Sequence, residues 1–240
     1  MKKVALVIGG TGGIGSAISS FLTSKGIRVY ATYYQNEDKA NSMKASLRGF
    51  YVLPCDIRNE DDVNRVFGIV LQKESRIDIM VNAVTTPLKM KPFESMATEE
   101  LYLDINTILI GSMNLLRHII PAMKKNRSGV IISILTSAIF DCPVRMSSYI
   151  AAKSGLFGLM NGISKELDQF NIRVLGISPS FVKTKLLNAF PSKLIEIQRD
   201  RIINTEEIAK LVLKMIEDEN KYPNGTNILL KERRDILQYI

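Results

Sequence analysis

Seven short apolar segments, separated by longer amphipathic ones, constrain the fold of this chain more than any other feature. They are KVALVIG (3–9), IRVYATYY (27–34), GFYVLPCD (49–56), IDIMVNAV (77–84), GVIISIL (129–135), IRVLGIS (172–178) and GTNILL (225–230). Several are almost wholly apolar and lack the alternation of a strand with one face in water, so we expect strands covered on both faces. Strands that alternate with helices then form a doubly wound parallel sheet. We therefore predict an α/β fold with three layers, αβα.

The segments between the apolar runs carry helix signals. Residues 16–25 place apolar side chains on one face and are followed by Gly26, a typical helix stop. Asn59 precedes three acids that suit the start of a helix, and Asn204 with Glu207 resembles a capping box. No Pro-, Gly- or Ser-rich linker interrupts the 240 residues, so we expect one domain over residues 1–240.

Charge and composition narrow the function classes. The chain has a formal net charge of +8, but its Lys and Arg residues are interspersed with acids and form no basic stripe. This pattern predicts no nucleic-acid partner. No apolar stretch reaches bilayer length, and the two cysteines, Cys55 and Cys142, have no framework spacing, which favours a cytoplasmic protein without a membrane segment. With His118 as the only histidine, we expect no metal site, and acid–base chemistry must use Tyr, Lys or carboxylates.

The stretch VALVIGGTGGIGSAISSFL combines a strand, a glycine-rich turn and a helix. Gly9 permits a tight turn off the strand, Gly13 lets the backbone approach a pyrophosphate, and Gly15 lets helix and strand pack closely. The helix N-terminus then offers free N–H groups and a partial positive charge to a phosphate. The turn therefore favours a dinucleotide site in a Rossmann-type fold.

Tyr149 and Lys153 are four residues apart in SSYIAAKSG, so their side chains share one helix face. Such a pair alone is common on helix surfaces. Together, however, Gly9-x-x-x-Gly13-x-Gly15 and Tyr149-x-x-x-Lys153 resemble the short-chain dehydrogenases/reductases, and most of all their 3-oxoacyl-acyl-carrier-protein reductase branch. The resemblance covers nearly the whole chain.

Further landmarks of that family fall in order along the chain. Asp56 matches the acid that contacts the adenine, Asn82-Ala83 matches a strand end, and Asn106 matches the helix Asn of the proton relay. The resemblance implies that the cofactor is bound by Gly9, Gly10, Thr11, Gly12, Gly13, Ile14, Gly15, Tyr33, Tyr34, Asp56, Ile57, Asn82, Ala83, Tyr149, Lys153, Pro179, Val182 and Thr184.

The resemblance also implies the chemistry, the reduction of a ketone to a secondary alcohol with Tyr149 as proton donor. A nearby ammonium favours a phenolate, so Lys153 is expected to lower the pKa of Tyr149. In the family this Lys also holds the nicotinamide ribose, and the Asn, here Asn106, holds a water. The carbonyl-binding Ser of the family falls on Thr136, and Ser137 next to it is the alternative after a one-residue shift.

The dinucleotide is expected to be NADP(H) rather than NAD(H). Tyr33 stands where the family has an acid that repels a 2′-phosphate. The usual basic partners of that phosphate are missing, because Gly12 and Tyr34 occupy their positions, which leaves the hydroxyls of Tyr33, Tyr34 or Thr32.

The chain also departs from the family pattern, and its partners stay open. Val84 and Ser180 replace family glycines, so a non-catalytic or attenuated dinucleotide-binding regulator is the competing hypothesis. Residues 180–203 are expected to form a lid over a small ketone or alcohol, free or linked to a carrier protein or coenzyme A. Arg127 suits carrier docking, but Phe170 at a second docking position does not. The family resemblance implies a homo-oligomer, either a tetramer or a dimer.

Overall fold

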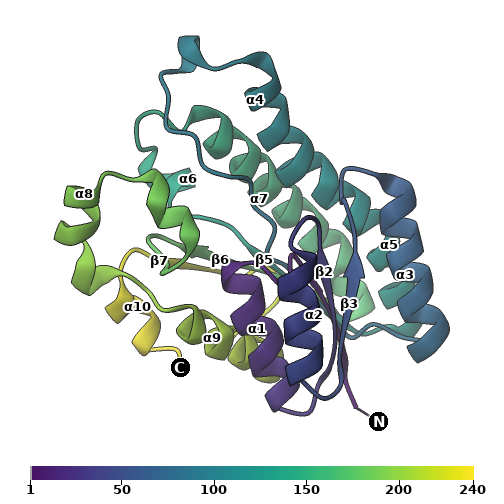
Figure 1. The fold of residues 1–240 in the computed structure, drawn as a ribbon. Helices are drawn as coiled ribbons and strands as arrows, with labels where there is room; N and C mark the ends of the chain where they lie inside the picture. The colour runs from purple at the N-terminus through teal and green to yellow at the C-terminus, as the bar shows by residue number, and fades with distance from the viewer. Residues whose placement is uncertain (1) are drawn as a thin grey trace.

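The computed structural model describes residues 2–240, and its strands form one parallel sheet (Figure 1). The order across the sheet is β3-β2-β1-β4-β5-β6-β7, and every neighbouring pair is parallel. The strands are β1 Val4–Ile8, β2 Arg28–Tyr33, β3 Phe50–Pro54, β4 Ile79–Asn82, β5 Gly129–Ile134, β6 Ile172–Pro179 and β7 Asn227–Leu230. Each predicted apolar segment coincides with one of these strands, β6 running one residue past its segment, so the predicted doubly wound sheet is confirmed.

Helices connect the strands and cover both faces of the sheet. They are α1 Gly13–Ser24, α2 Glu37–Ser46, α3 Glu60–Glu74, α4 Thr98–Asp104, α5 Gly111–Asn126, α6 Ala138–Asp141, α7 Ser147–Leu167, α8 Ser192–Ile197, α9 Thr205–Glu217 and α10 Arg233–Leu237. A π-helical turn, Ile105–Ile110, joins α4 to α5. Shorter 3₁₀ turns cover Phe93–Ser95, Asp168–Phe170, Lys185–Ala189 and Arg199–Arg201.

The helix starts follow the capping signals. The side chain of Asn59 accepts hydrogen bonds from the N–H groups of Asp61 and Asp62, and the N–H of Asn204 donates to Glu207. α1 begins at Gly13, three residues before the predicted start, because the glycine turn itself enters the helix.

Two apolar layers hold the helices against the sheet. On one face, side chains of α3, α5 and α7 pack against the strands, and on the other face those of α1, α9 and α10 do so (Figure 1). In α9, Ile208, Leu211 and Met215 are fully buried. Burial of each such side chain stabilises the fold by about 1.5–3 kcal/mol.

The strand order reverses beside β1, and this reversal positions the site. β1 pairs with β2 on one side and with β4 on the other, through Val7 opposite both Ala31 and Val81. The connections leave β1 and β4 in opposite directions, which opens a crevice beyond the carboxyl ends of these strands. The glycine turn after β1 and Asn82 at the end of β4 lie at this edge.

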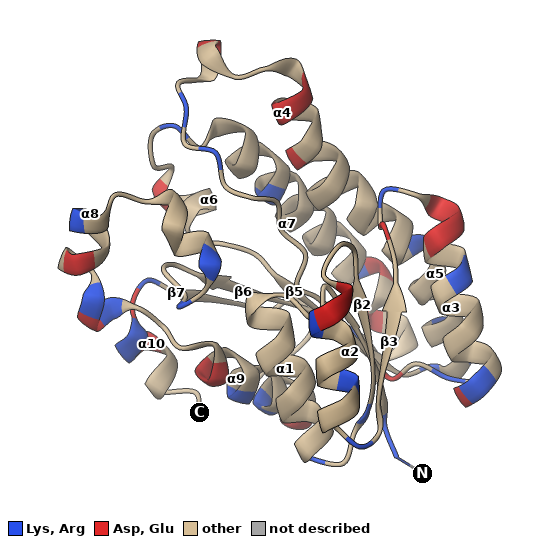
Figure 2. Cartoon of the chain, viewed as in Figure 1, with Lys and Arg blue, Asp and Glu red and all other residues tan. Residues whose placement is uncertain are grey.

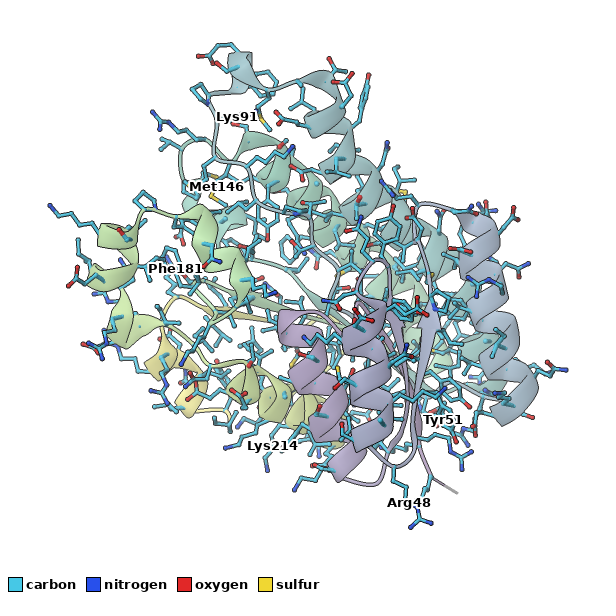
Figure 3. All side chains as sticks on the ribbon, in the orientation of Figure 1. Arg48, Tyr51, Lys91, Met146, Phe181 and Lys214 are labelled. Carbon is cyan, nitrogen blue, oxygen red and sulfur yellow. The ribbon has the colours of Figure 1, made fainter. Side chains whose placement is uncertain are left out.

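The rest of the carboxyl edge is built by β5, β6 and the segment that follows β6. That segment leaves the sheet after Pro179 and returns where the Ile203 N–H donates to the Phe181 carbonyl, at 2.9 Å. Figure 3 shows Phe181 and Met146, which precedes α7, toward this end of the molecule, and Arg48 toward the opposite end. Residues 180–203, the segment for which a lid was predicted, follow this course; below they are called the lid segment.

Candidate active site

The glycine-rich turn leaves the N-terminus of α1 open to an anion. Gly9 has φ +68°, a left-handed conformation that favours glycine, and the Gly12 N–H donates to its carbonyl at 2.9 Å. No side chain caps α1 and no acid lies in its first turn, whereas α3 begins with a side-chain cap and three acids. The first N–H groups of α1 therefore stay available, and these residues fit the pyrophosphate of a dinucleotide.

Two glycines of the turn have distinct packing roles. A Cβ on Gly15 would lie 2.1 Å from the carbonyl oxygen of Gly9, so only glycine lets α1 start this close to the turn. A Cβ on Gly13 would lie 2.7 Å from Cγ2 of Thr184, which comes from the lid segment. The structure therefore brings Thr184 onto the predicted phosphate turn.

The remaining residues of the turn differ in how closely they pack against the rest of the protein. A Cβ on Gly10 would lie 2.6 Å from Cβ of Ala31 in β2. Thr11 is buried, and Ile14 is half-buried against the apolar layer of that face. Gly12 is less crowded than Gly10: a Cβ on Gly12 would have only one atom within 4 Å, the Gly9 oxygen at 3.1 Å.

Tyr149 and Lys153 lie on the buried side of α7, one turn apart. Tyr149 is 6% exposed and Lys153 2%. The Nζ of Lys153 donates to the carbonyl oxygens of Ile134 at 2.8 Å and Val84 at 3.2 Å, which end β5 and follow β4. The same nitrogen lies 6.0 Å from the centre of the Tyr149 ring. The ordinary alternative, a solvated surface pair, is therefore wrong.

The pKa values of this pair move in opposite directions. Burial raises the pKa of the Tyr149 phenol, while hydrogen bonds with Thr85 and Thr136 act the other way. Burial lowers the pKa of Lys153 to about 7. The expectation that Lys153 lowers the pKa of Tyr149 is not met in this structure, because desolvation of the phenol outweighs the opposing effects. The phenol therefore keeps its proton well above neutral pH.

Thr136 is among the groups that act on the pKa of the phenol, whereas Ser137 is not. The Thr136 hydroxyl accepts from the Ala138 N–H at 3.2 Å. Ser137 is buried and turns its N–H to the Pro179 carbonyl. Thr85, which the sequence did not single out, also acts on the pKa of the phenol. Thr85 directly follows Asn82-Ala83-Val84, and this position in the sequence could have indicated that it lies at the site.

Asn106, predicted from the family resemblance to hold a water, lies in the π-helical turn that packs against α7. Its side chain is exposed and makes no direct hydrogen bond within residues 2–240. The role of Asn106 in a proton relay therefore stays a prediction.

At the far end of the crevice, Arg58 joins the predicted Asp56 and Tyr34. Its guanidinium binds the Asp56 carboxylate at 2.6 Å, donates to the Tyr34 hydroxyl at 2.9 Å and lies 5.2 Å from the centre of that ring. Hydrogen bonds from Arg58 lower the pKa of Asp56. Tyr33 is half-buried, and burial raises the pKa of its phenol.

A second cation, Lys39 of α2, reaches the glycine turn. Its Nζ donates to the Gly12 carbonyl at 3.3 Å and to the Ser16 hydroxyl at 3.4 Å. Burial, and then the neighbouring charge of Lys185, lower the pKa of Lys39. From the sequence we predicted no basic residue at this end of the crevice. The family positions that usually carry one are occupied here by Gly12 and Tyr34, and Lys39 and Arg58 lie elsewhere in the chain.

The remaining predicted residues pack or form hydrogen bonds around the crevice and stabilise its walls. The Asn82 side chain donates to Ser112 at 2.8 Å and accepts from the Val84 N–H at 3.2 Å, so it ties β4 to α5. Ala83 packs against the apolar layer, and the Ile57 carbonyl accepts from Asn114. Pro179 ends β6, and the buried Val182 pairs with Ile203.

Comparison with known proteins identifies the family. The sequence profile described as short chain dehydrogenase matches residues 3–194. The chain belongs to the short-chain dehydrogenase family. It is therefore an NAD(P)-dependent oxidoreductase of that family, as the two motifs predicted.

Curated relatives are similar over almost their whole length. The chain is 30% identical to a 3-oxoacyl-acyl-carrier-protein reductase of Thermotoga maritima, with 93% of this chain and 94% of the relative covered. It is also 30% identical to an acetoacetyl-CoA reductase of Shinella zoogloeoides, with 95% and 96% covered. Among solved structures, a 3-ketoacyl-acyl-carrier-protein reductase of Brucella melitensis complexed with NADH has a TM-score of 0.88 at 21% identity, with 95% of this chain and 96% of the other covered. At that identity the likeness shows the fold.

Residues 2–240 show neither a membrane span nor a metal centre. No helix there is long and apolar enough to cross a bilayer. The same residues contain no group of three His, Cys, Asp or Glu side chains placed to hold a metal ion. Basic and acidic residues are interspersed along the surface helices (Figure 2).

Proposed function

We propose that this short-chain dehydrogenase reduces a ketone to a secondary alcohol, with Tyr149 as the proton donor. The observation that carries the proposal is the buried Tyr149 phenol, held with Thr85 and Thr136 at the same edge of the sheet as the open N-terminus of α1. When bound, the dinucleotide would supply the hydride.

The protonation state of the phenol suits Tyr149 to the role of proton donor. Burial raises the pKa of Tyr149, so the neutral phenol dominates at working pH. A neutral phenol can give a proton to an oxygen that gains charge, whereas oxidation of an alcohol needs a base. The Thr136 hydroxyl would hold the carbonyl oxygen, and Lys153 would orient the ribose beside Tyr149.

The preference for NADP(H) has support at the far end of the crevice. Tyr33 presents no carboxylate that would repel a 2′-phosphate, and the cations of Lys39 and Arg58 lie near the glycine turn and beside Tyr34. Arg and Lys are the side chains that bind phosphate groups. We expect these two cations to take the place of the missing family partners.

The substrate class is proposed to be a 3-oxoacyl thioester. Two of the curated relatives are named for carrier-linked and coenzyme A-linked substrates. The lid segment carries Lys183, Lys185 and Lys193, which could meet the phosphates of either carrier. Arg127 donates to the Gln169 carbonyl at 3.1 Å, and with Lys124 it packs over the Phe170 ring, so basic charge persists at the proposed carrier-docking position.

A homo-oligomer is proposed as well. The exposed Tyr102 and Ile110 lie on α4 and on the π-helical turn after it, and a second copy of the chain could cover them. Sedimentation analysis at micromolar concentration would distinguish a monomer from a dimer or tetramer.

The test of the proposed function is NADPH oxidation with a panel of ketones that includes acetoacetyl-CoA and its free acid. We expect turnover of at least one thioester, a preference for NADPH over NADH, and loss of at least about 100-fold in kcat for Tyr149→Phe. Dinucleotide binding without turnover of any ketone would instead support the non-catalytic regulator. Equal activity of Tyr149→Phe and wild type would reject Tyr149 as proton donor.

A further inference from the structure

Asp104, the last residue of α4, is a buried carboxylate beside the candidate proton donor. It is 8% exposed, and its two oxygens accept hydrogen bonds from the hydroxyls of Thr86 and Ser148, each at 2.5 Å. Burial of a carboxylate is costly unless strong hydrogen bonds offset the lost hydration. No Lys or Arg of residues 2–240 forms an ion pair with Asp104, so its charge is held by neutral donors.

The two donors adjoin the residues that define the environment of the phenol. Thr86 follows Thr85, whose hydroxyl acts on the pKa of Tyr149, and Ser148 precedes Tyr149 itself. One carboxylate therefore ties the loop after β4 to the first turn of α7. Since both segments contribute groups to the candidate site, the tie fixes their relative position.

The charge of Asp104 also acts on the phenol. After burial, which is the main cause, this negative charge raises the pKa of Tyr149 further. The other ionisable group of α7 at the site is Lys153, whose Nζ is occupied by two backbone carbonyls. On the solvent side of α4, Lys89 and Lys91 pair with Glu100.

We propose that Asp104 is a positioning residue for Tyr149: its carboxylate, bound by the hydroxyls of Thr86 and Ser148, holds the loop after β4 against the first turn of α7 and places a negative charge near the phenol. The role as an aid to catalysis rests on the proposed function of Tyr149. The effect on the phenol itself does not depend on any substrate.

Asp104→Asn separates the charge from the hydrogen bonds. An amide keeps one acceptor and gains donors, and both hydroxyls can either donate or accept, so the tie can persist while the charge is removed. The titration of Tyr149 is followed by NMR of protein labelled with ¹³Cζ-tyrosine, with the resonance assigned through Tyr149→Phe. We expect the midpoint to fall by on the order of one pH unit, as for a charge several ångströms away. Glu99→Gln, on the exposed side of α4, is the matched control and should leave the midpoint unchanged.

Ser148→Ala tests the tie with the charge retained. We expect a fall in kcat of about fivefold or more with little change in KM, and recovery in Ser148→Thr, which restores the hydroxyl. Thermal melts establish that each variant is folded. The proposal is overturned if Asp104→Asn titrates as wild type does, or if Ser148→Ala keeps full kcat. Because the NMR titration needs no substrate, a wild-type protein that reduces no ketone would reject the proposed function and still leave the effect on the phenol measurable.

Discussion

The Nζ of Lys153 lies 6.0 Å from the centre of the Tyr149 ring and donates to two backbone carbonyls at the carboxyl edge of the sheet. The buried amine is thus held between the end of β5, at Ile134, and the segment after β4, at Val84. Fixing an amine where water is excluded lowers its pKa, and the effect has consequences for stability.

Lys153→Met should change how stability depends on pH. The pKa of Lys153 is about 7 in the folded protein and 10.5 as the ordinary value. Between these values the unfolded chain binds more protons than the folded one, so wild-type stability rises with pH across this window. We expect the variant to lack this rise, which amounts to a few kcal/mol at about pH 10. Urea unfolding at several pH values measures the difference, and parallel curves for the two proteins would contradict the buried, depressed amine.

Thr136→Val and Ser137→Ala should have unequal effects. Thr136 contacts the phenol, and loss of its hydroxyl leaves a developing oxyanion without one donor. We expect kcat to fall by about 10- to 100-fold for Thr136→Val and by less than about twofold for Ser137→Ala. Steady-state assays with a ketone that the proposed panel shows to be a substrate compare the two variants. A larger loss of kcat in Ser137→Ala than in Thr136→Val would instead assign the carbonyl-binding role to Ser137.

The fold could be predicted from the sequence because the apolar segments determine it directly. Segments such as KVALVIG and IRVLGIS are apolar on both sides, and only a sheet covered on both faces buries them. The glycine turn and the Tyr149/Lys153 pair were predictable for a related reason: each depends on neighbours in the same element. Lys39 and Arg58 come from a separate helix and a separate loop, and no local pattern connects them to the site.

Asn106 was predicted from the family resemblance alone, because no local pattern gives the direction of its side chain. It lies within a π-helical turn, where side chains do not follow the period of 3.6 of an α-helix. Since the Asn106 side chain is exposed, we expect Asn106→Ala to keep kcat within about twofold of wild type. Solvent isotope effects on kcat should also be unchanged. A loss of 100-fold would place Asn106 in a proton relay after all.

Lys39→Ala and Arg58→Ala should weaken binding of NADPH more than of NADH. The two cations lie at the crevice end where a 2′-phosphate is expected, and loss of one charged hydrogen bond to phosphate costs about 1.5–3 kcal/mol. We expect KM for NADPH to rise about 10-fold or more while KM for NADH changes little. Lys44→Ala, an exposed lysine of the same helix α2, is the control. Equal losses for both cofactors would mean that these residues hold the pyrophosphate or only the fold.

Gly13→Ala and Gly15→Ala add the same methyl group two residues apart. We expect Gly15→Ala to lower stability and Gly13→Ala to lower dinucleotide affinity. At Gly15 the new carbon would lie 2.1 Å from the backbone oxygen of Gly9, which cannot move without distorting the turn, so we expect a loss of about 3 kcal/mol in unfolding free energy. At Gly13 the nearest atom is Cγ2 of Thr184, on a lid segment that can shift, so stability should stay within about 1 kcal/mol while dinucleotide affinity falls. Thr184→Ser removes that methyl group and should restore part of the affinity of Gly13→Ala. Thermal melts and fluorescence titration with NADPH separate the two effects, and equal destabilisation by both substitutions would show that Thr184 is as rigid as the turn it contacts.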